Sequence, residues 1–122
     1  MKKILLADDE PALRRLVAVT LADESRFQIL HAANGQEALD VARAEHPIVL
    51  LLDVNMPGID GYEVCRALKA DPATADIVIL ILTANAEPED QERGFAAGAD
   101  GYFKKPFSPL ALLERVESVL ED

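Results

Sequence analysis

The chain has 122 residues, of which 50% are hydrophobic and 28% charged, a composition that excludes a disordered chain and predicts one globular domain over residues 1–122. Its formal net charge of −10 argues against direct nucleic-acid binding, which needs a basic surface. The single cysteine, Cys65, excludes an internal disulfide, and no apolar run approaches the roughly 20 residues of a membrane span. We therefore expect a cytoplasmic protein without a membrane partner.

Short aliphatic runs recur along the chain and predict strands at residues 4–7, 48–52 and 77–82. Runs without polar alternation are typical of parallel strands that are covered on both faces. Residues 27–30 and 101–103 are weaker strand candidates. The sequence thus favours a parallel sheet of five strands.

Helical spacing of apolar residues follows each expected strand. The expected helix starts carry a capping residue or a proline: Pro11, Asn34 with Glu37, Asp60 with Glu63, and Ser108 with Pro109. Five strand–helix units with short connections predict an open α/β sheet with helices on both faces, because such crossovers are right-handed.

The helix expected around residues 88–97 has the weakest pattern. Gly94 lies in its middle, where glycine costs about 1 kcal/mol relative to alanine, and Phe95 is its only large apolar side chain. Two interpretations remain open: a solvated helix that packs through small residues, or a marginal element that can shift.

Reactive side chains follow the expected strands. They are Asp8, Asp9 and Glu10 after the first strand, Asp53 and Asn55 after the third, Thr83 after the fourth, and Lys105 after the fifth. Ligand sites of open parallel sheets lie at the carboxyl ends of the strands, so we expect these residues to meet there. Taken singly, each is typical of a charged turn or a surface position.

Several carboxylates that meet in one place repel one another, and a hard divalent cation such as Mg²⁺ resolves the repulsion through oxygen ligands. Lys105 adds a positive charge and Thr83 a hydroxyl, so the group is equipped to hold a phosphoryl group. Asp53 is the candidate nucleophile, since a carboxylate can attack phosphorus and form an acyl phosphate.

Motifs spread along the whole chain resemble those of one family. They are "LLADDEP", "ANGQEAL", "VLLLDVNMPGIDGYE", "ILTA" and "AGADGYFKKPF", followed by the last helix. Together they resemble the receiver domain of two-component response regulators. The resemblance implies a flavodoxin-like, doubly wound (βα)5 fold with strand order 2-1-3-4-5.

The resemblance also implies roles for residues that match the family motifs. Asp53 would be the phosphoacceptor, and Asp9 a direct Mg²⁺ ligand, with Asp8 acting directly or through water. Asn55 would offer its backbone carbonyl to the metal, and Lys105 would pair with a phosphoryl oxygen. The implied cofactor is Mg²⁺, with Mn²⁺ as an alternative.

The resemblance also implies residues that respond when Asp53 is phosphorylated. Thr83 would bond the phosphoryl group, and Tyr102 would be the aromatic residue whose rotamer follows. For Tyr102 a second interpretation stays open, namely a partly buried strand tyrosine with an exposed hydroxyl. Asn55 and Asn85 match positions tied to the dephosphorylation rate, and Lys104 is expected to face solvent.

The implied function is a phosphorylation-activated signalling switch. A sensor histidine kinase or a histidine phosphotransfer protein would donate the phosphoryl group, and the receiver would catalyse the transfer and its own dephosphorylation without being a turnover enzyme. The output face would consist of the fourth helix, the fifth strand and the fifth helix, which could also form a phosphorylation-dependent dimer. The sequence identifies neither the output, the kinase nor the oligomeric state.

Two other functions remain as alternatives to the phosphorylation switch. Aspartyl phosphatases of the haloacid-dehalogenase type also use an aspartate nucleophile with Mg²⁺, but their second aspartate shuttles a proton that the amide of Asn55 cannot carry. A degenerate receiver that acts only as an interaction module would have a damaged site, whereas Asp9, Asp53, Thr83 and Lys105 are all present. His31 and His46 have no paired ligand and are expected to be structural or exposed, and Cys65 to be a core residue.

Overall fold

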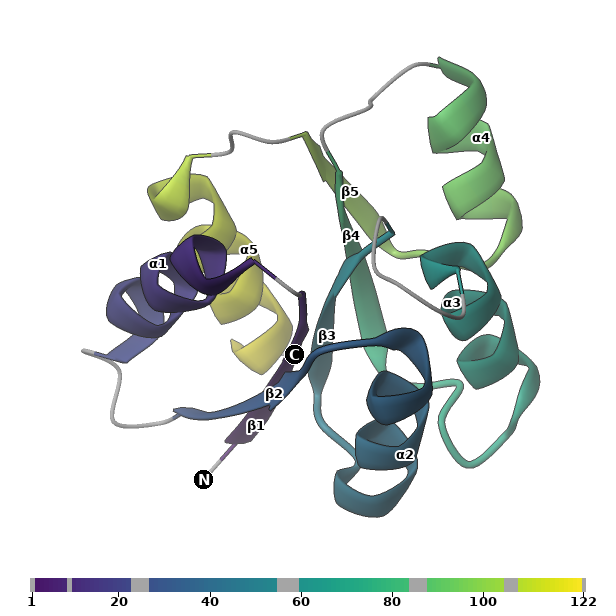
Figure 1. Ribbon diagram of the computed structural model, residues 1–122, viewed down its shortest axis with the longest axis horizontal. Helices are drawn as coiled ribbons and strands as arrows, with labels where there is room; N and C mark the ends of the chain where they lie inside the picture. The colour runs from purple at the N-terminus through teal and green to yellow at the C-terminus, as the bar shows by residue number, and fades with distance from the viewer. Residues whose placement is uncertain are drawn as a thin grey trace.

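The computed structural model describes residues 2–8, 10–22, 27–54, 60–83, 88–104 and 108–121. Strands and helices alternate through these ranges (Figure 1). The strands are β1 (Lys2–Ala7), β2 (Phe27–Ala32), β3 (Val49–Asp53), β4 (Val78–Thr83) and β5 (Gly101–Lys104). The helices are α1 (Pro11–Ala22), α2 (Gly35–Glu45), α3 (Gly61–Ala70), α4 (Pro88–Ala96) and α5 (Pro109–Glu121). In these ranges no helix is both long enough and apolar enough to span a membrane.

The five strands form one parallel sheet in the order β2-β1-β3-β4-β5. This confirms the expected α/β architecture and strand order. The strand order reverses between β1 and β3, and their carboxyl ends are aligned because Ala7 pairs with Leu52. The ends of β3 and β4 are aligned in the same way, since Asp53 pairs with Leu82.

Helices cover both faces of the sheet, as Figure 1 shows, with α1 and α5 on one side and α2, α3 and α4 on the other. Alternate residues of each strand point to opposite faces. In β3, Leu50 and Leu52 therefore join the core under α2 to α4, and Leu51 joins the core under α1 and α5. All three are fully buried, which explains the unbroken aliphatic run of this strand.

Three helix starts are capped as the sequence predicts. Asn34 accepts a hydrogen bond from the backbone N–H of Glu37 at 2.9 Å, and Asp60 accepts one from Tyr62 at 2.7 Å. The hydroxyl of Ser108 accepts a hydrogen bond from the N–H of residue 111 at 3.2 Å. Each cap satisfies a donor that the first helical turn leaves without a partner.

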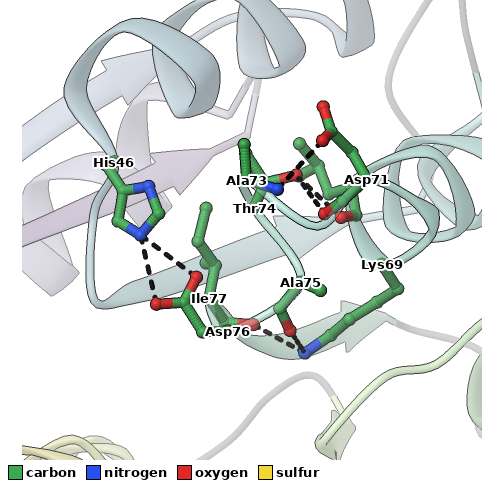
Figure 2. Close-up of polar contacts among 9 residues, drawn as sticks. His46, Lys69, Asp71, Ala73, Thr74, Ala75, Asp76 and Ile77 are labelled. Carbon is green, nitrogen blue, oxygen red and sulfur yellow. Dashed lines mark hydrogen bonds and ion pairs between the residues drawn. The ribbon is translucent and has the colours of Figure 1, made fainter.

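Two contacts fix the amino ends of β3 and β4 (Figure 2). His46 ends α2 in the left-handed conformation, with φ of 48°, and its imidazole lies 3.1 Å from the carboxylate of Asp76. Lys69 donates hydrogen bonds from its ammonium group to the carbonyl oxygens of Ala75 at 3.1 Å and Ile77 at 2.7 Å. Both side chains of the His46 pair are exposed, as the sequence analysis expects for this histidine.

Cys65 is the core residue that the sequence analysis expects. It is fully buried, and its thiol donates to the carbonyl oxygen of Ala97 at 3.5 Å. Burial raises the pKa of the thiol to about 11. The thiol is therefore protonated at neutral pH, which argues against a reactive role.

Helix α4 packs on the sheet through a glycine. Gly94 is the buried residue of this helix, whereas Phe95 is 52% exposed. A methyl group on Gly94 would lie 3.1 Å from the Cδ1 atom of Ile81 and 3.3 Å from the ring of Tyr102. The interpretation of a helix that packs through small residues is confirmed, and its ability to shift stays a prediction.

Candidate functional site

The site is built around Asp53, the last residue of the central strand β3. Its side chain is only 1% exposed, although carboxylates are rarely buried without partners. Asp8 follows β1 directly on one side and is fully buried, and Thr83 ends β4 on the other side and is 1% exposed. The parallel register thus brings three residues that the sequence analysis singles out to one edge of the sheet.

Three carboxylates gather at this edge. One oxygen each from Asp8, Glu10 and Asp53 can be chosen so that all three lie within 4.8 Å of one another. Asp8 and Asp53 are expected site residues, whereas no individual role is expected for Glu10 from the sequence. Asp8 and Glu10 are neighbours in the "DDE" motif, but only the turn after β1 shows that both carboxylates face Asp53.

The turn that carries Asp8 is held by several hydrogen bonds. The carboxylate of Asp8 accepts from the backbone N–H of Glu10 at 2.7 Å, and its own N–H donates to the carbonyl oxygen of Ala32 at 3.1 Å. Arg14 donates from Nε to the carbonyl oxygen of Asp8 at 2.8 Å. The backbone of β2 and a cation from α1 therefore hold the turn that carries the Asp8 carboxylate.

Arg14 also affects His31 near the end of β2. Burial, with a smaller contribution from the nearby charge of Arg14, holds the pKa of the His31 imidazole below its usual value. The ring is only partly buried, and the residue as a whole is exposed, one of the two outcomes expected for this histidine.

The donor set fits a hard divalent cation. Carboxylate oxygens are the preferred ligands of Mg²⁺ and Mn²⁺, and the group of three contains no sulfur or imidazole. A cation would also offset the repulsion between two buried carboxylates, those of Asp8 and Asp53. The structure thus supports an acidic group that could hold a metal ion.

The second half of the site links Thr83 to Tyr102 on β5. The hydroxyl of Tyr102 lies 3.5 Å from that of Tyr62, and the side chains of Tyr102 and Thr83 share a hydrogen bond. Burial and the contact with Tyr62 raise the pKa of the Tyr102 hydroxyl, and the bond with Thr83 opposes this shift. The hydroxyl of Tyr102 therefore has two side-chain partners, and the role of Tyr102 in switching stays a prediction.

The start of α3 lies directly against the end of β3. A methyl group on Gly61 would lie 2.6 Å from the Cα of Val54 and 3.0 Å from the carbonyl oxygen of Asp53. Only glycine permits this approach of the helix to the backbone that carries Asp53. The sequence predicts the neighbouring Asp60 as a cap, but it gives no sign of this close contact.

Four expected site residues lie outside the described residues: Asp9, Asn55, Asn85 and Lys105. Their roles stay predictions. Lys104, the neighbour of Lys105, is exposed as expected.

Comparisons with known proteins agree with this arrangement. The family model of the response regulator receiver domain matches residues 4–117. The phosphate regulon transcriptional regulatory protein PhoB of Pseudomonas aeruginosa is 42% identical over 119 residues, which are 98% of this chain and 52% of that protein. A probable transcriptional regulator, ycf27 of Pyropia yezoensis, is 44% identical over 98% of this chain and 47% of its own length.

Solved structures show the same fold over the whole chain. The chemotaxis response regulator CheY4 of Vibrio cholerae superposes with a TM-score of 0.88 at 37% identity, covering 98% of each chain. The chain spans about half the length of the curated relatives that it matches, whereas it spans nearly all of this structure. The sequence match, the strand order and the acidic edge of the sheet agree, and the chain belongs to the response regulator receiver domain family.

Proposed function

We propose that this receiver domain is a switch that is activated when Asp53 accepts a phosphoryl group from a phosphohistidine of a partner protein. The observation that carries the proposal is the group of Asp8, Glu10 and Asp53 carboxylates within 4.8 Å of one another at the carboxyl edge of the sheet. A buried aspartate beside further acids and a threonine is suited to metal-assisted phosphoryl transfer rather than to a structural role.

The chemistry follows from the residues of this chain. A carboxylate oxygen of Asp53 attacks phosphorus, the P–O bond forms as the P–N bond breaks, and the electron pair returns to the histidine nitrogen. Asp8 and the predicted ligands Asp9 and Asn55 would hold the cation, together with Asp53. Bound Mg²⁺ would supply positive charge that offsets the charge of the phosphoryl oxygens.

Two further residues would stabilise the phosphoryl group. Lys105 would pair with one of its oxygens, and the hydroxyl of Thr83 would donate to another. The bond between Thr83 and Tyr102 supports a link from this group to β5. Water later attacks phosphorus, which releases inorganic phosphate and restores the Asp53 carboxylate.

The output would be a change in the surface formed by α4, β5 and α5. Tyr102 lies on β5 and contacts α4 through Gly94, so that a change at Thr83 can reach this surface. Phe95 on α4 and Leu110 on α5 are 52% and 63% exposed, which suits a protein partner, an attached output domain or a second copy of the chain. Asn55 and Asn85 would set the lifetime of the acyl phosphate.

Intact mass spectrometry tests the proposal. The chain is incubated with a small phosphodonor, acetyl phosphate, in MgCl2 or in EDTA. We expect one added phosphate in MgCl2, little in EDTA, and none in Asp53→Asn. A phosphate that persists in Asp53→Asn would contradict the assignment of the acceptor.

A further inference from the structure

A second group of charged and aromatic side chains connects α3 with α4 beside the site. Arg93, in the last turn of α4, forms an ion pair with the carboxylate of Asp60 at 2.8 Å. The same guanidinium lies over the ring of Tyr62, 4.4 Å from its centroid. Figure 1 shows the two helices as neighbours on one face of the sheet. We call Arg93, Asp60 and Tyr62 the α3–α4 clasp.

Asp60 is bonded on both of its oxygens. One accepts from the backbone N–H of Tyr62 and caps α3, and the other accepts from Arg93. Gly61, which lies between Asp60 and Tyr62, packs against the carbonyl oxygen of Asp53. The clasp thus connects α4 to the backbone that carries the acceptor residue.

Tyr62 extends the clasp toward β5. It is 4% exposed, and its hydroxyl contacts the carbonyl oxygen of Asp90 at 3.4 Å and the hydroxyl of Tyr102 at 3.5 Å. Tyr102 in turn shares a hydrogen bond with Thr83. One connected series therefore runs from Thr83 through both tyrosines to Arg93 on the outside of α4.

We propose that Arg93 is a positioning residue that, through Tyr62, holds α4 in the place where Tyr102 stays beside Thr83. The stacked guanidinium fixes the ring of Tyr62, and the ion pair fixes the start of α3. Apart from this attachment, α4 packs on the sheet through Gly94, a buried residue without a side chain. When the clasp opens, α4 becomes free to move and Tyr102 loses a neighbour.

The coupling of the clasp to phosphorylation rests on the function proposed above. A phosphoryl group on Asp53 that draws in Thr83 would alter its bond with Tyr102. Tyr102 would pass this change to Tyr62, and the clasp would pass it to α4. Arg93 is more than half exposed, so its replacement tests the coupling without a cavity in the core.

The chain offers a direct probe of the clasp because it has two tyrosines, Tyr62 and Tyr102, and both belong to this series. The chain of 122 residues, labelled with 3-fluorotyrosine, should give two ¹⁹F resonances, which Tyr62→Phe assigns. We expect Arg93→Gln to shift both resonances and to speed amide exchange of residues 88–96 about threefold to tenfold, as for loss of a modest surface contact. Arg93→Lys should change the two resonances and the amide exchange of α4 less than Arg93→Gln does, since lysine keeps the charge but not the planar stack.

Arg43→Gln is the matched control, because Arg43 is an exposed arginine in the last turn of α2, away from the clasp. It should leave both resonances and the exchange of α4 unchanged. The proposal is overturned if Arg93→Gln shifts only the Tyr62 resonance and leaves the exchange of α4 at the wild-type rate.

A second arm adds acetyl phosphate and MgCl2 and follows the phosphate by mass spectrometry. In wild type, the Tyr102 resonance and the exchange of α4 should change together. In Arg93→Gln the resonance should still respond while the exchange of α4 no longer changes, and an unaltered response of α4 would contradict the coupling. If wild type gains no phosphate, the proposed function fails, and the comparison without phosphodonor still decides whether Arg93 positions α4.

Discussion

The carboxylates of Asp8 and Asp53 lie within 4.8 Å of each other, and both side chains are almost completely buried. Their closeness follows from the fold, because β1 and β3 are neighbours and their carboxyl ends are in register. Two buried like charges destabilise the folded state unless a cation or donors compensate them. This pair is therefore a property of the site that can be measured apart from any phosphate transfer.

Removal of one charge should stabilise the metal-free protein. In EDTA we expect Asp53→Asn to raise the free energy of unfolding by about 1 to 3 kcal/mol, since close charges at an intermediate dielectric repel by this order. Millimolar MgCl2 should stabilise wild type more than Asp53→Asn, because ligands that bind the folded state add to its stability. Urea unfolding measures both quantities. Equal responses of the two proteins to MgCl2 would argue against a metal site at Asp53.

The raised pKa of the Tyr102 hydroxyl should make the free energy of unfolding depend on pH in the alkaline range. Its pKa is raised in the folded state, so the folded protein retains a proton that the unfolded chain loses above the ordinary tyrosine pKa of about 10. The contribution is fully present below that pH and is lost as the pH rises above it. Urea unfolding between neutral and alkaline pH should show a smaller loss of stability in Tyr102→Phe than in wild type. Parallel pH profiles of the two proteins would rule out this contribution.

Gly61→Ala should disturb both stability and the site. The new methyl group would meet the backbone of Val54 and the carbonyl oxygen of Asp53, and backbone cannot yield as a flexible side chain does. We expect a loss of about 1 to 3 kcal/mol in the free energy of unfolding, the usual cost of overpacking. Phosphorylation of Asp53 should also slow. The change is checked by urea unfolding and by the rate of phosphate gain, with Ala70→Gly, at the exposed end of the same helix, as the comparison.

Two ion pairs of equal length allow a test of burial. Lys69 lies 2.8 Å from the carboxylate of Asp100, and Lys3 lies 2.8 Å from that of Glu45, but their side chains are 19% and 36% exposed. Lys69 also donates to two carbonyl oxygens. We expect Lys69→Met to cost about 2 kcal/mol, because the carbonyl oxygens of Ala75 and Ile77 lose this donor and the Asp100 carboxylate loses its cation.

The matched variant Lys3→Met should change stability by about 0.5 kcal/mol or less, as is usual for exposed ion pairs. Chemical denaturation of the two variants gives the comparison. A loss at Lys69 no larger than that at Lys3 would show that the ammonium does not hold the turn before β4.

The fold could be predicted from sequence because its signals are local. The aliphatic run that ends at Asp53 identifies a central strand, and the caps Asn34, Asp60 and Ser108 mark helix starts that the structure confirms. The carboxyl-edge rule for parallel sheets then places Asp8, Asp53 and Thr83 together without any knowledge of side-chain contacts. A resemblance to receiver domains supplies the strand order.

The features that could not be predicted from the sequence depend on contacts between residues that are distant in the chain. Arg93 reaches Asp60 and Tyr62 across more than 30 positions, and no spacing rule connects them. Gly61 looks like an ordinary first helical residue until the neighbouring backbone is seen. The contacts of the Tyr102 hydroxyl with Tyr62 and Thr83 also join residues that are distant in sequence, so the sequence does not show them.

The most direct test of the central claim is chemical identification of the phosphorylated residue. After reaction with acetyl phosphate and MgCl2, borohydride reduces an acyl phosphate and converts the aspartyl side chain to that of homoserine, whereas phosphate esters and phosphohistidine do not yield homoserine. Peptide mass spectrometry should locate this conversion at position 53 and nowhere else. Phosphate gained without conversion at position 53, or conversion at Asp8 instead, would contradict the assignment of Asp53 as the acceptor.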